Sequence, residues 1–123
     1  MDDIIEKRTK WIDYKGKEIL LDDYTNLQGE ELVETIEVLT NHLMNSGKKE
    51  ILLLIDLNNS YTNKEVVNAF TEAGKRVRPV VKRTAVLGIT GVKKILLNVV
   101  NKLSSIDANP FSTEEDAKDW LIS

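Results

Sequence analysis

The chain of 123 residues contains no cysteine, one histidine (His42) and two prolines, and aromatic residues make up only 6% of it. Without cysteine it forms no disulfide and no thiolate metal site, so nothing indicates a secreted, oxidised setting. A lone histidine cannot assemble a zinc site or a Cys–His nucleophile. No apolar run approaches the ~20 residues of a membrane span, and the N-terminus lacks a signal-peptide pattern. We expect a soluble, cytoplasmic protein without metal or cofactor.

The length and composition indicate a single globular domain over residues 1–123. Hydrophobic residues make up 41% and charged residues 30% of the chain, both near the globular norm. A chain of this size buries a sizeable core but is too short for two domains.

The net charge of −3 conceals an uneven distribution. Residues 64–105 contain nine basic and two acidic residues, which gives this block a charge of +7 and leaves −10 on the remainder. Such a division favours an anionic partner or a second copy that presents its acidic part, as in a homodimer, although solvated lysine-rich helix faces would look the same. Nucleic acid is disfavoured, because no aromatic residues alternate with the basic ones.

The first half of the chain predicts a hairpin, a helix and a buried strand. The hairpin comprises Lys7–Tyr14 and Lys17–Asp23 and turns at Lys15-Gly16. A helix over Gln28–Asn45 follows from apolar residues at helical spacing. The uninterrupted apolar run Ile51–Ile55 is typical of a strand that is covered on both faces of a parallel sheet.

The second half continues this alternation. A helix is expected over Asn63–Val77, capped by Thr62 or Asn63, and a buried strand over Arg83–Ile89. An amphipathic helix follows, with an apolar stripe, and then a possible short strand near Asn109–Phe111. The stripe consists of Val92, Ile95, Leu96, Val99, Val100 and Leu103. The capping-box spacing of Ser112-Thr113-Glu114-Glu115 begins a terminal helix. The order predicts an α/β domain with a mixed, mainly parallel sheet, an N-terminal hairpin and about four helices.

Two loops fall where α/β sheets bind ligands, beyond the carboxyl ends of the strands. The first runs from Asp56 to Asn63, and the second is Gly88-Ile89-Thr90-Gly91, followed by Lys93 and Lys94 in the first helical turn. Uncovered N–H groups at the glycines and the helix N-terminus suit an anion, while tight strand-to-helix packing explains the glycines equally well. The candidate ligand- or partner-binding residues are Asp56, Asn58, Ser60, Thr62, Gly88, Thr90, Gly91, Lys93 and Lys94.

No catalytic arrangement emerges from the sequence. Asp22 and Asp23, like the acids at Glu114–Asp116, are adjacent rather than converging. The Gly88–Gly91 loop has neither the Walker nor the dinucleotide-binding spacing. We therefore predict a protein that is not an enzyme, and the remaining enzymatic hypothesis would rest on Asp56 or Thr90.

From Trp11 to Leu121 the chain resembles the STAS/SpoIIAA-like family of small bacterial proteins. The resemblance rests on the order and spacing of several segments: Tyr14–Ile19, Asp56–Val66, Pro79–Lys82, Gly88–Gly91 with Lys94-Ile95, and Glu115–Leu121. It implies the fold of anti-sigma-factor antagonists, and more distantly that of the lipid-carrying Sec14 domain. In the antagonists a serine or threonine before the second helix is phosphorylated. Ser60 and Thr62 lie in the matching loop, but Asn-Ser-Tyr-Thr-Asn replaces the antagonists' Asp-Ser-Ser-Gly or Asp-Ser-Thr-Gly signature.

Two functional hypotheses follow. The first is a non-enzymatic, STAS-like regulatory or protein-interaction domain whose surface includes Asn58–Asn63, Gly88–Gly91 and the two lysines Lys93 and Lys94. The second is a protein that binds an anion, a nucleotide or a lipid head group between the two loops. The sequence identifies neither the partner nor the ligand.

Overall fold

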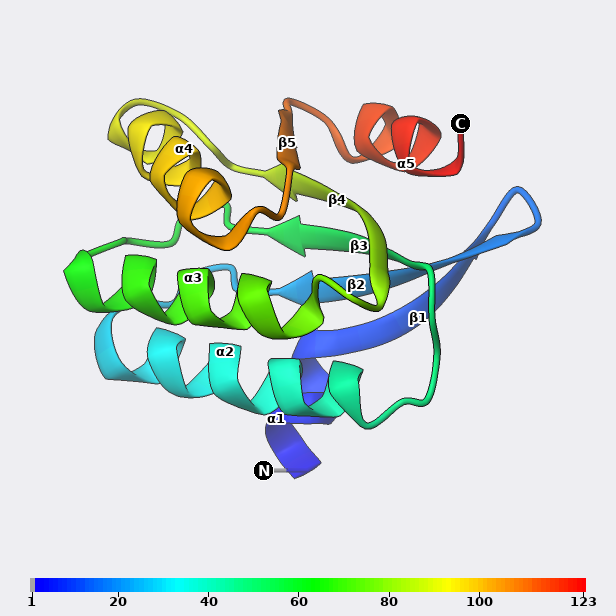
Figure 1. Ribbon diagram of the computed structural model, residues 1–123, viewed down its shortest axis with the longest axis horizontal. Helices are drawn as coiled ribbons and strands as arrows, with labels where there is room; N and C mark the ends of the chain where they lie inside the picture. Colours follow the sequence, from blue (N-terminus) through cyan, green and yellow to red (C-terminus); the bar gives the residue numbers. More distant parts are fainter. Residues whose placement is uncertain (1) are drawn as a thin grey trace.

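Strands and helices alternate through the computed structural model, which describes residues 2–123 (Figure 1). The strands are β1 (Thr9–Tyr14), β2 (Lys17–Asp23), β3 (Ile51–Asp56), β4 (Val81–Leu87) and β5 (Ala108–Phe111). The helices are α1 (Asp2–Arg8), α2 (Gly29–Met44), α3 (Lys64–Val77), α4 (Val92–Ser104) and α5 (Glu114–Ile122). The mixed α/β class and the N-terminal hairpin predicted from the sequence are confirmed.

The five strands form one sheet in the order β1-β2-β3-β4-β5. β1 pairs antiparallel with β2, and the other neighbours pair in parallel. The turn between β1 and β2 places Lys15 and Gly16 at φ values of 50° and 84°. Two consecutive left-handed residues match the right-handed twist of a hairpin, which explains why Lys-Gly marks this turn.

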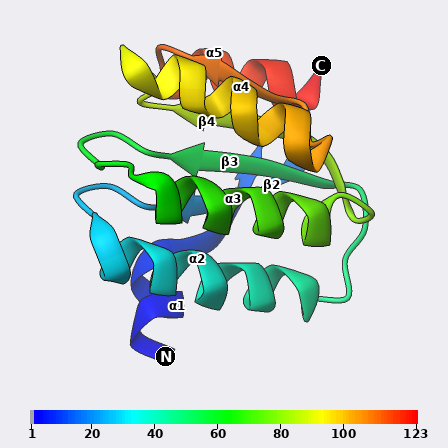
Figure 2. The same ribbon diagram turned by 60° about the vertical axis from the view of Figure 1, so that its left-hand side comes forward.

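The helices cover the two faces of the sheet unequally. α2, α3 and α4 lie side by side on one face, and α5 alone lies on the other (Figures 1 and 2). On the three-helix face, Leu20, Leu53 and Val86 are buried against the helices. On the opposite face, Leu54 and Leu87 pack with Leu121 of α5. β3 is therefore buried on both faces, as its continuous apolar run predicts.

The structure differs from the sequence-based expectation at the N-terminus. The hairpin was expected to begin at Lys7, but residues 2–8 form α1, so the chain has five described helices rather than about four. Ile4 packs against the core cluster under α2. Arg8, in the last helical turn, donates a hydrogen bond from Nη1 to the carbonyl oxygen of Thr25 at 2.8 Å. These tertiary contacts stabilise a helix too short to persist on its own.

Two further boundaries need correction. β4 ends at Leu87, two residues before the expected end at Ile89, because Gly88 turns the chain away at a φ of 83°. The terminal helix is capped by Thr113, whose side chain accepts a hydrogen bond from the backbone N–H of Asp116 at 3.1 Å, and not by Ser112. The cap therefore lies one position later than the Ser-x-x-Glu pattern predicted.

Candidate functional site

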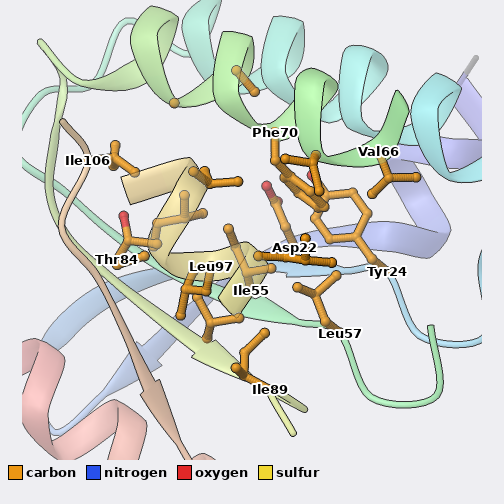
Figure 3. A pocket seen from close by; sticks show the side chains of 18 of the residues that line it. Asp22, Tyr24, Ile55, Leu57, Val66, Phe70, Thr84, Ile89, Leu97 and Ile106 are labelled. Carbon is orange, nitrogen blue, oxygen red and sulfur yellow. The ribbon is translucent and has the colours of Figure 1, made fainter. Parts of the chain in front are cut away.

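A cavity of about 90 Å³ lies between the sheet, α3 and α4 (Figure 3). Its wall is almost entirely apolar, with Ile55 and Val86 from the sheet, Val66 and Phe70 from α3, and Leu97 from α4. Packed cores contain few voids larger than a water molecule, so a cavity of this size is unusual. Its walls suit an apolar group.

One carboxyl group lines this cavity. Asp22 follows Leu20 by two residues on β2, so its side chain lies on the same face of the sheet, beneath the helices, and it is only 4% exposed. Its Oδ1 accepts a hydrogen bond from Oγ1 of Thr9 at 2.7 Å, the one side-chain hydrogen bond that Asp22 makes within residues 2–123. Burial in this apolar environment raises the pKa of Asp22 to about 7, and the Thr9 hydrogen bond offsets only part of that rise.

A second polar group lies on the other side of the cavity. Thr84 of β4 is buried, and its Oγ1 has no hydrogen-bond partner in the described part of the chain. Figure 3 shows Thr84 beside Ile106, across the cavity from Asp22, Tyr24 and Phe70. Buried polar atoms are rarely left unpaired in proteins, so this hydroxyl is a feature of the site that folding alone does not explain.

Lys93 lies at the edge of the cavity where α4 begins. Its Nζ donates to the carbonyl oxygens of Leu57 at 3.1 Å and Gly88 at 3.3 Å, and partial burial lowers its pKa. The ammonium group therefore fixes the start of α4 to the ends of β3 and β4. Lys94, its neighbour in sequence, is exposed and makes no side-chain hydrogen bond or ion pair among residues 2–123.

The two predicted loops lie against each other at the carboxyl edge of the sheet. An added Cβ at Gly88 would approach the backbone nitrogen of Asn58 to 2.5 Å, so close backbone packing requires glycine there. Asp56 Oδ1 accepts hydrogen bonds from the backbone and the side chain of Asn58, both at 2.9 Å. Gly91 caps α4 at a φ of 57° with open space around it, and Thr90 is exposed. Packing thus accounts for Gly88, whereas the binding role of these loop residues stays a prediction.

The two predicted phosphorylation sites differ in accessibility. Ser60 is 2% exposed, and its hydroxyl donates to the carbonyl oxygen of Leu57 at 2.7 Å. Thr62 is half-buried and lines the cavity, while the neighbouring Asn63 caps α3 by accepting from the backbone N–H of Val66 at 2.9 Å. A kinase would have to open this loop to reach Ser60, and phosphorylation stays a prediction.

The apolar stripe of α4 is divided between the cavity and solvent. Leu96 and Val100 line the cavity, but the other members face outward with large exposed fractions. These outward residues, called the outer α4 face below, are Val92 (65% exposed), Ile95 (64%), Val99 (38%) and Leu103 (58%). The stripe therefore does not bury as a whole, in contrast to the usual behaviour of an amphipathic helix.

Polar contacts near its C-terminal end explain this rotation of α4. Asn101 pairs with β5 through both amide atoms, donating to the carbonyl oxygen of Ala108 at 2.9 Å and accepting from its N–H at 3.0 Å. Ser104 is buried against Gly74 of α3, where an added Cβ would lie 2.9 Å from the serine Cβ. Asn101 and Ser104 thus point inward, and the outer α4 face must point away.

The structure also changes the interpretation of the positively charged block of residues 64–105. Arg76 reaches Glu37 of α2 at 3.7 Å and Lys75 reaches Glu72 at 3.3 Å, so part of the positive charge is paired within the fold. Arg83 donates from Nη1 to the carbonyl oxygen of Trp120 at 2.7 Å. Five basic residues of this block make no side-chain hydrogen bond or ion pair among residues 2–123, and they lie on several elements: Lys64, Arg78, Lys82, Lys94 and Lys102.

Sequence reasoning missed the cavity and its polar lining. Asp22 was treated only as a neighbour of Asp23, although the spacing of Leu20 and Asp22 places both on one face of β2. That alternation was the available signal for a buried acid. The cavity itself depends on how α4 is rotated, which hydrophobic periodicity does not determine.

No group of three or more His, Cys, Asp or Glu side chains within residues 2–123 is arranged to hold a metal ion. In the same part of the chain, every helix is too short or too polar to span a bilayer.

Comparison with known proteins defines the class of fold. The chain matches a crystal structure from Shewanella loihica PV-4, described as an uncharacterised protein of the DUF3478 family with a SpoIIAA-like fold. The TM-score is 0.69 at 20% sequence identity, and the match covers 92% of this chain and 91% of the other. No protein-family model and no curated protein matches the chain. The chain therefore has a SpoIIAA-like fold, as its sequence motifs predicted.

Proposed function

We propose that this STAS-like domain is a non-enzymatic protein that binds a small, largely apolar molecule in the cavity beneath α4. The observation that carries the proposal is the cavity of about 90 Å³, lined by side chains such as Ile55, Phe70 and Leu97. An apolar cavity excludes water and takes up apolar guests, because filling it restores lost dispersion contacts. This proposal differs from the sequence-based hypothesis of an anion, nucleotide or lipid head group between the two loops, because the wall of the cavity is almost entirely apolar.

Two neighbouring positions on α4 provide a matched test. Val100 lines the cavity, whereas Val99 belongs to the outer α4 face. Val100→Trp should fill the cavity, and Val99→Trp places the same side chain on the same helix toward solvent. Xenon is a suitable probe because it enters small apolar cavities without needing polar contacts.

In NMR spectra of the protein under xenon pressure, resonances of the cavity wall should shift in the wild type and in Val99→Trp but not in Val100→Trp. Each form should also be purified from the native host and extracted with organic solvent. Mass spectrometry should then detect a small molecule in the extracts of the wild type and Val99→Trp but not in that of Val100→Trp. Equal xenon shifts in both variants, or none in the wild type, would contradict the proposal.

A second function is favoured by the outer α4 face, which fits the regulatory or protein-interaction hypothesis. Its four exposed apolar residues lie on a helix that carries Lys93, Lys94 and Lys102 and no acidic residue. Charge complementarity makes an acidic protein surface the preferred occupant. A second copy through α4 itself is less favourable, since it would bring the lysines of two helices together.

The test uses Ile95→Asp on the outer α4 face. A stoichiometric partner from the native host should bind the wild type, dissociate with rising salt and fail to bind Ile95→Asp. Lys102→Glu should weaken the same complex while leaving the outer apolar residues intact. Concentration-dependent dimerisation of the purified chain, abolished by Ile95→Asp, would instead assign the face to a second copy.

A further inference from the structure

The polar side of the cavity holds a carboxyl group that the fold leaves incompletely satisfied. Asp22 is 4% exposed, and only its Oδ1 has a hydrogen-bond partner among residues 2–123, Oγ1 of Thr9 at 2.7 Å. None of the ion pairs in that part of the chain includes Asp22. A buried carboxyl is normally paired or fully hydrogen-bonded, so the second oxygen of Asp22 lacks the partner that its position calls for.

Aromatic rings border the same part of the cavity. Tyr24 and Phe70 both line it, with ring centroids 5.4 Å apart in an edge-to-face arrangement. Figure 3 shows Asp22 grouped with these two residues on one side of the cavity. Aromatic faces attract cations, and a carboxylate supplies the opposite charge. An acid beside two aromatic rings therefore forms a polar end that suits a protonated amine.

Lys93, the only basic residue that lines the cavity, does not serve as the partner of Asp22. Its Nζ donates to the carbonyl oxygens of Leu57 and Gly88 at the carboxyl edge of the sheet. Asp22 lies in register with Ile55 of β3, two residues before Leu57, which follows the end of that strand. The ammonium group of Lys93 thus helps to attach α4 to the sheet, and the carboxyl group of Asp22 remains available to a ligand.

We propose that the cavity binds the protonated amine end of a small apolar molecule, with the ammonium group donating to Asp22 and the hydrocarbon part against Phe70, Val66 and Leu97. This inference rests on the proposed binding of an apolar molecule in the same cavity and names the chemical class of that molecule. Burial raises the pKa of Asp22 to about 7, and a bound ammonium group favours the charged form of the carboxyl. The cavity of about 90 Å³ corresponds to roughly three water volumes, so the buried part is a short alkyl chain or a small ring.

Three probes of equal chain length test this assignment: n-butylammonium, n-butanol and butyrate, titrated by NMR at pH 7.5 and constant ionic strength. Butylammonium should bind about tenfold more tightly than butanol, because its hydrogen bond to Asp22 is charge-assisted. Butyrate should bind most weakly, since its charge has the same sign as that of Asp22. Asp22→Asn keeps the shape and the acceptor for Thr9, and should lower the affinity for butylammonium about tenfold while changing that for butanol less than twofold.

Thr84→Val is the matched control, because it changes the other polar group of the cavity on the opposite side and leaves the charge unaltered. It should preserve the preference for butylammonium over butanol. A measurement on the unmodified chain supports the variants: the carboxyl carbon resonance of Asp22 should titrate at lower pH when butylammonium is present. Tyr24, the other acidic titratable group that lines this end, ionises only well above pH 7.5, because burial raises its pKa, so it does not obscure that shift.

The outcomes separate this inference from the function on which it rests. Equal binding of butylammonium and butanol, unchanged in Asp22→Asn, would overturn the amine assignment while the cavity still binds apolar molecules. Tightest binding of butyrate, lost in Lys93→Gln, would overturn it in favour of an anionic ligand at the edge of the cavity. Failure of all three probes, together with failure of xenon, would overturn the proposed function itself.

Discussion

The helices α4 and α5 cover opposite faces of the same sheet in different ways. α5 has nine residues, and it buries Ala117 and Leu121 against β3 and β4. α4 has thirteen residues, and the only one that is fully buried is Ser104. The longer helix, with more apolar residues, is therefore the less completely packed of the two.

The polar contacts that attach α4 and α5 to the rest of the fold also differ. α5 is attached near its C-terminal end, where the hydroxyl of Tyr14 donates to Asp119 at 2.6 Å and Arg83 donates to the carbonyl oxygen of Trp120. α4 is attached by Lys93 at its start and Asn101 near its end, and its middle spans the cavity. A helix held at both ends over an apolar space is suited to covering a ligand, whereas α5 completes the core.

The largest expected effect tests whether α5 packs as a core element and α4 does not. Leu121→Ala should lower the free energy of unfolding by about 2–5 kcal/mol, because Leu121 is 2% exposed and its loss leaves a void. Ile95→Ala, at 64% exposure on the outer α4 face, should change it by less than about 0.5 kcal/mol. Urea denaturation of both variants measures the difference. A cost for Ile95→Ala near that of Leu121→Ala would mean that α4 is covered in solution.

The contrast between the helices also shows which parts of the fold follow from sequence. β3 was predictable because five consecutive apolar residues, Ile51–Ile55, bounded by charged residues, are typical of a strand buried on both faces. α5 was predictable because its start signal and its apolar positions are local features, although its cap lies one residue later than the spacing predicted. The rotation of α4 was not, since it is set by contacts between elements: Asn101 of α4 bonds to Ala108 of β5, and Ser104 packs against Gly74 of α3.

The second prediction concerns the free-energy cost of burying the charged carboxylate of Asp22 beside the cavity. Because burial raises the pKa of Asp22 from 3.8 to about 7, the folded state binds a proton more tightly than the unfolded state. The contribution of Asp22 to stability is therefore fully present below about pH 4 and is lost as the pH rises to about 7. Three pKa units correspond to an upper limit of about 4 kcal/mol.

Asp22→Asn removes this titration without removing the acceptor for Thr9. Relative to the wild type, its free energy of unfolding should rise by about 1–3 kcal/mol between pH 4 and pH 8, because only the wild type loses the contribution of a protonated Asp22 in this range. Urea denaturation across this range measures the trend, with Asp23→Asn as the control at the adjacent, half-exposed carboxylate. A flat difference for Asp22→Asn would show that the carboxyl is hydrated in the folded protein.

The candidate site was predictable only at its edge. The paired loops and Lys93 follow from the rule that ligands gather at the carboxyl ends of parallel strands, and the structure does bring Gly88, Asn58 and Lys93 together. The cavity behind these loops was not predictable, because it exists where the sheet, α3 and α4 do not fill the space between them. Asp22 could have been found from its register with Leu20, but no local pattern indicates that it lacks a partner.

The smallest expected effect on stability tests which residue caps the N-terminus of α5. Both Ser112 and Thr113 are residues that cap helices, and the Ser-x-x-Glu spacing favoured Ser112. The structure assigns the cap to Thr113, whose side chain accepts from the N–H of Asp116, so Thr113→Ala should cost about 1 kcal/mol. Ser112→Ala should cost less than about 0.5 kcal/mol, because Ser112 is exposed and its side chain makes no hydrogen bond within residues 2–123. Thermal unfolding of the two variants in parallel measures this difference, and a larger loss in Ser112→Ala would return the cap to the position that the sequence spacing predicted.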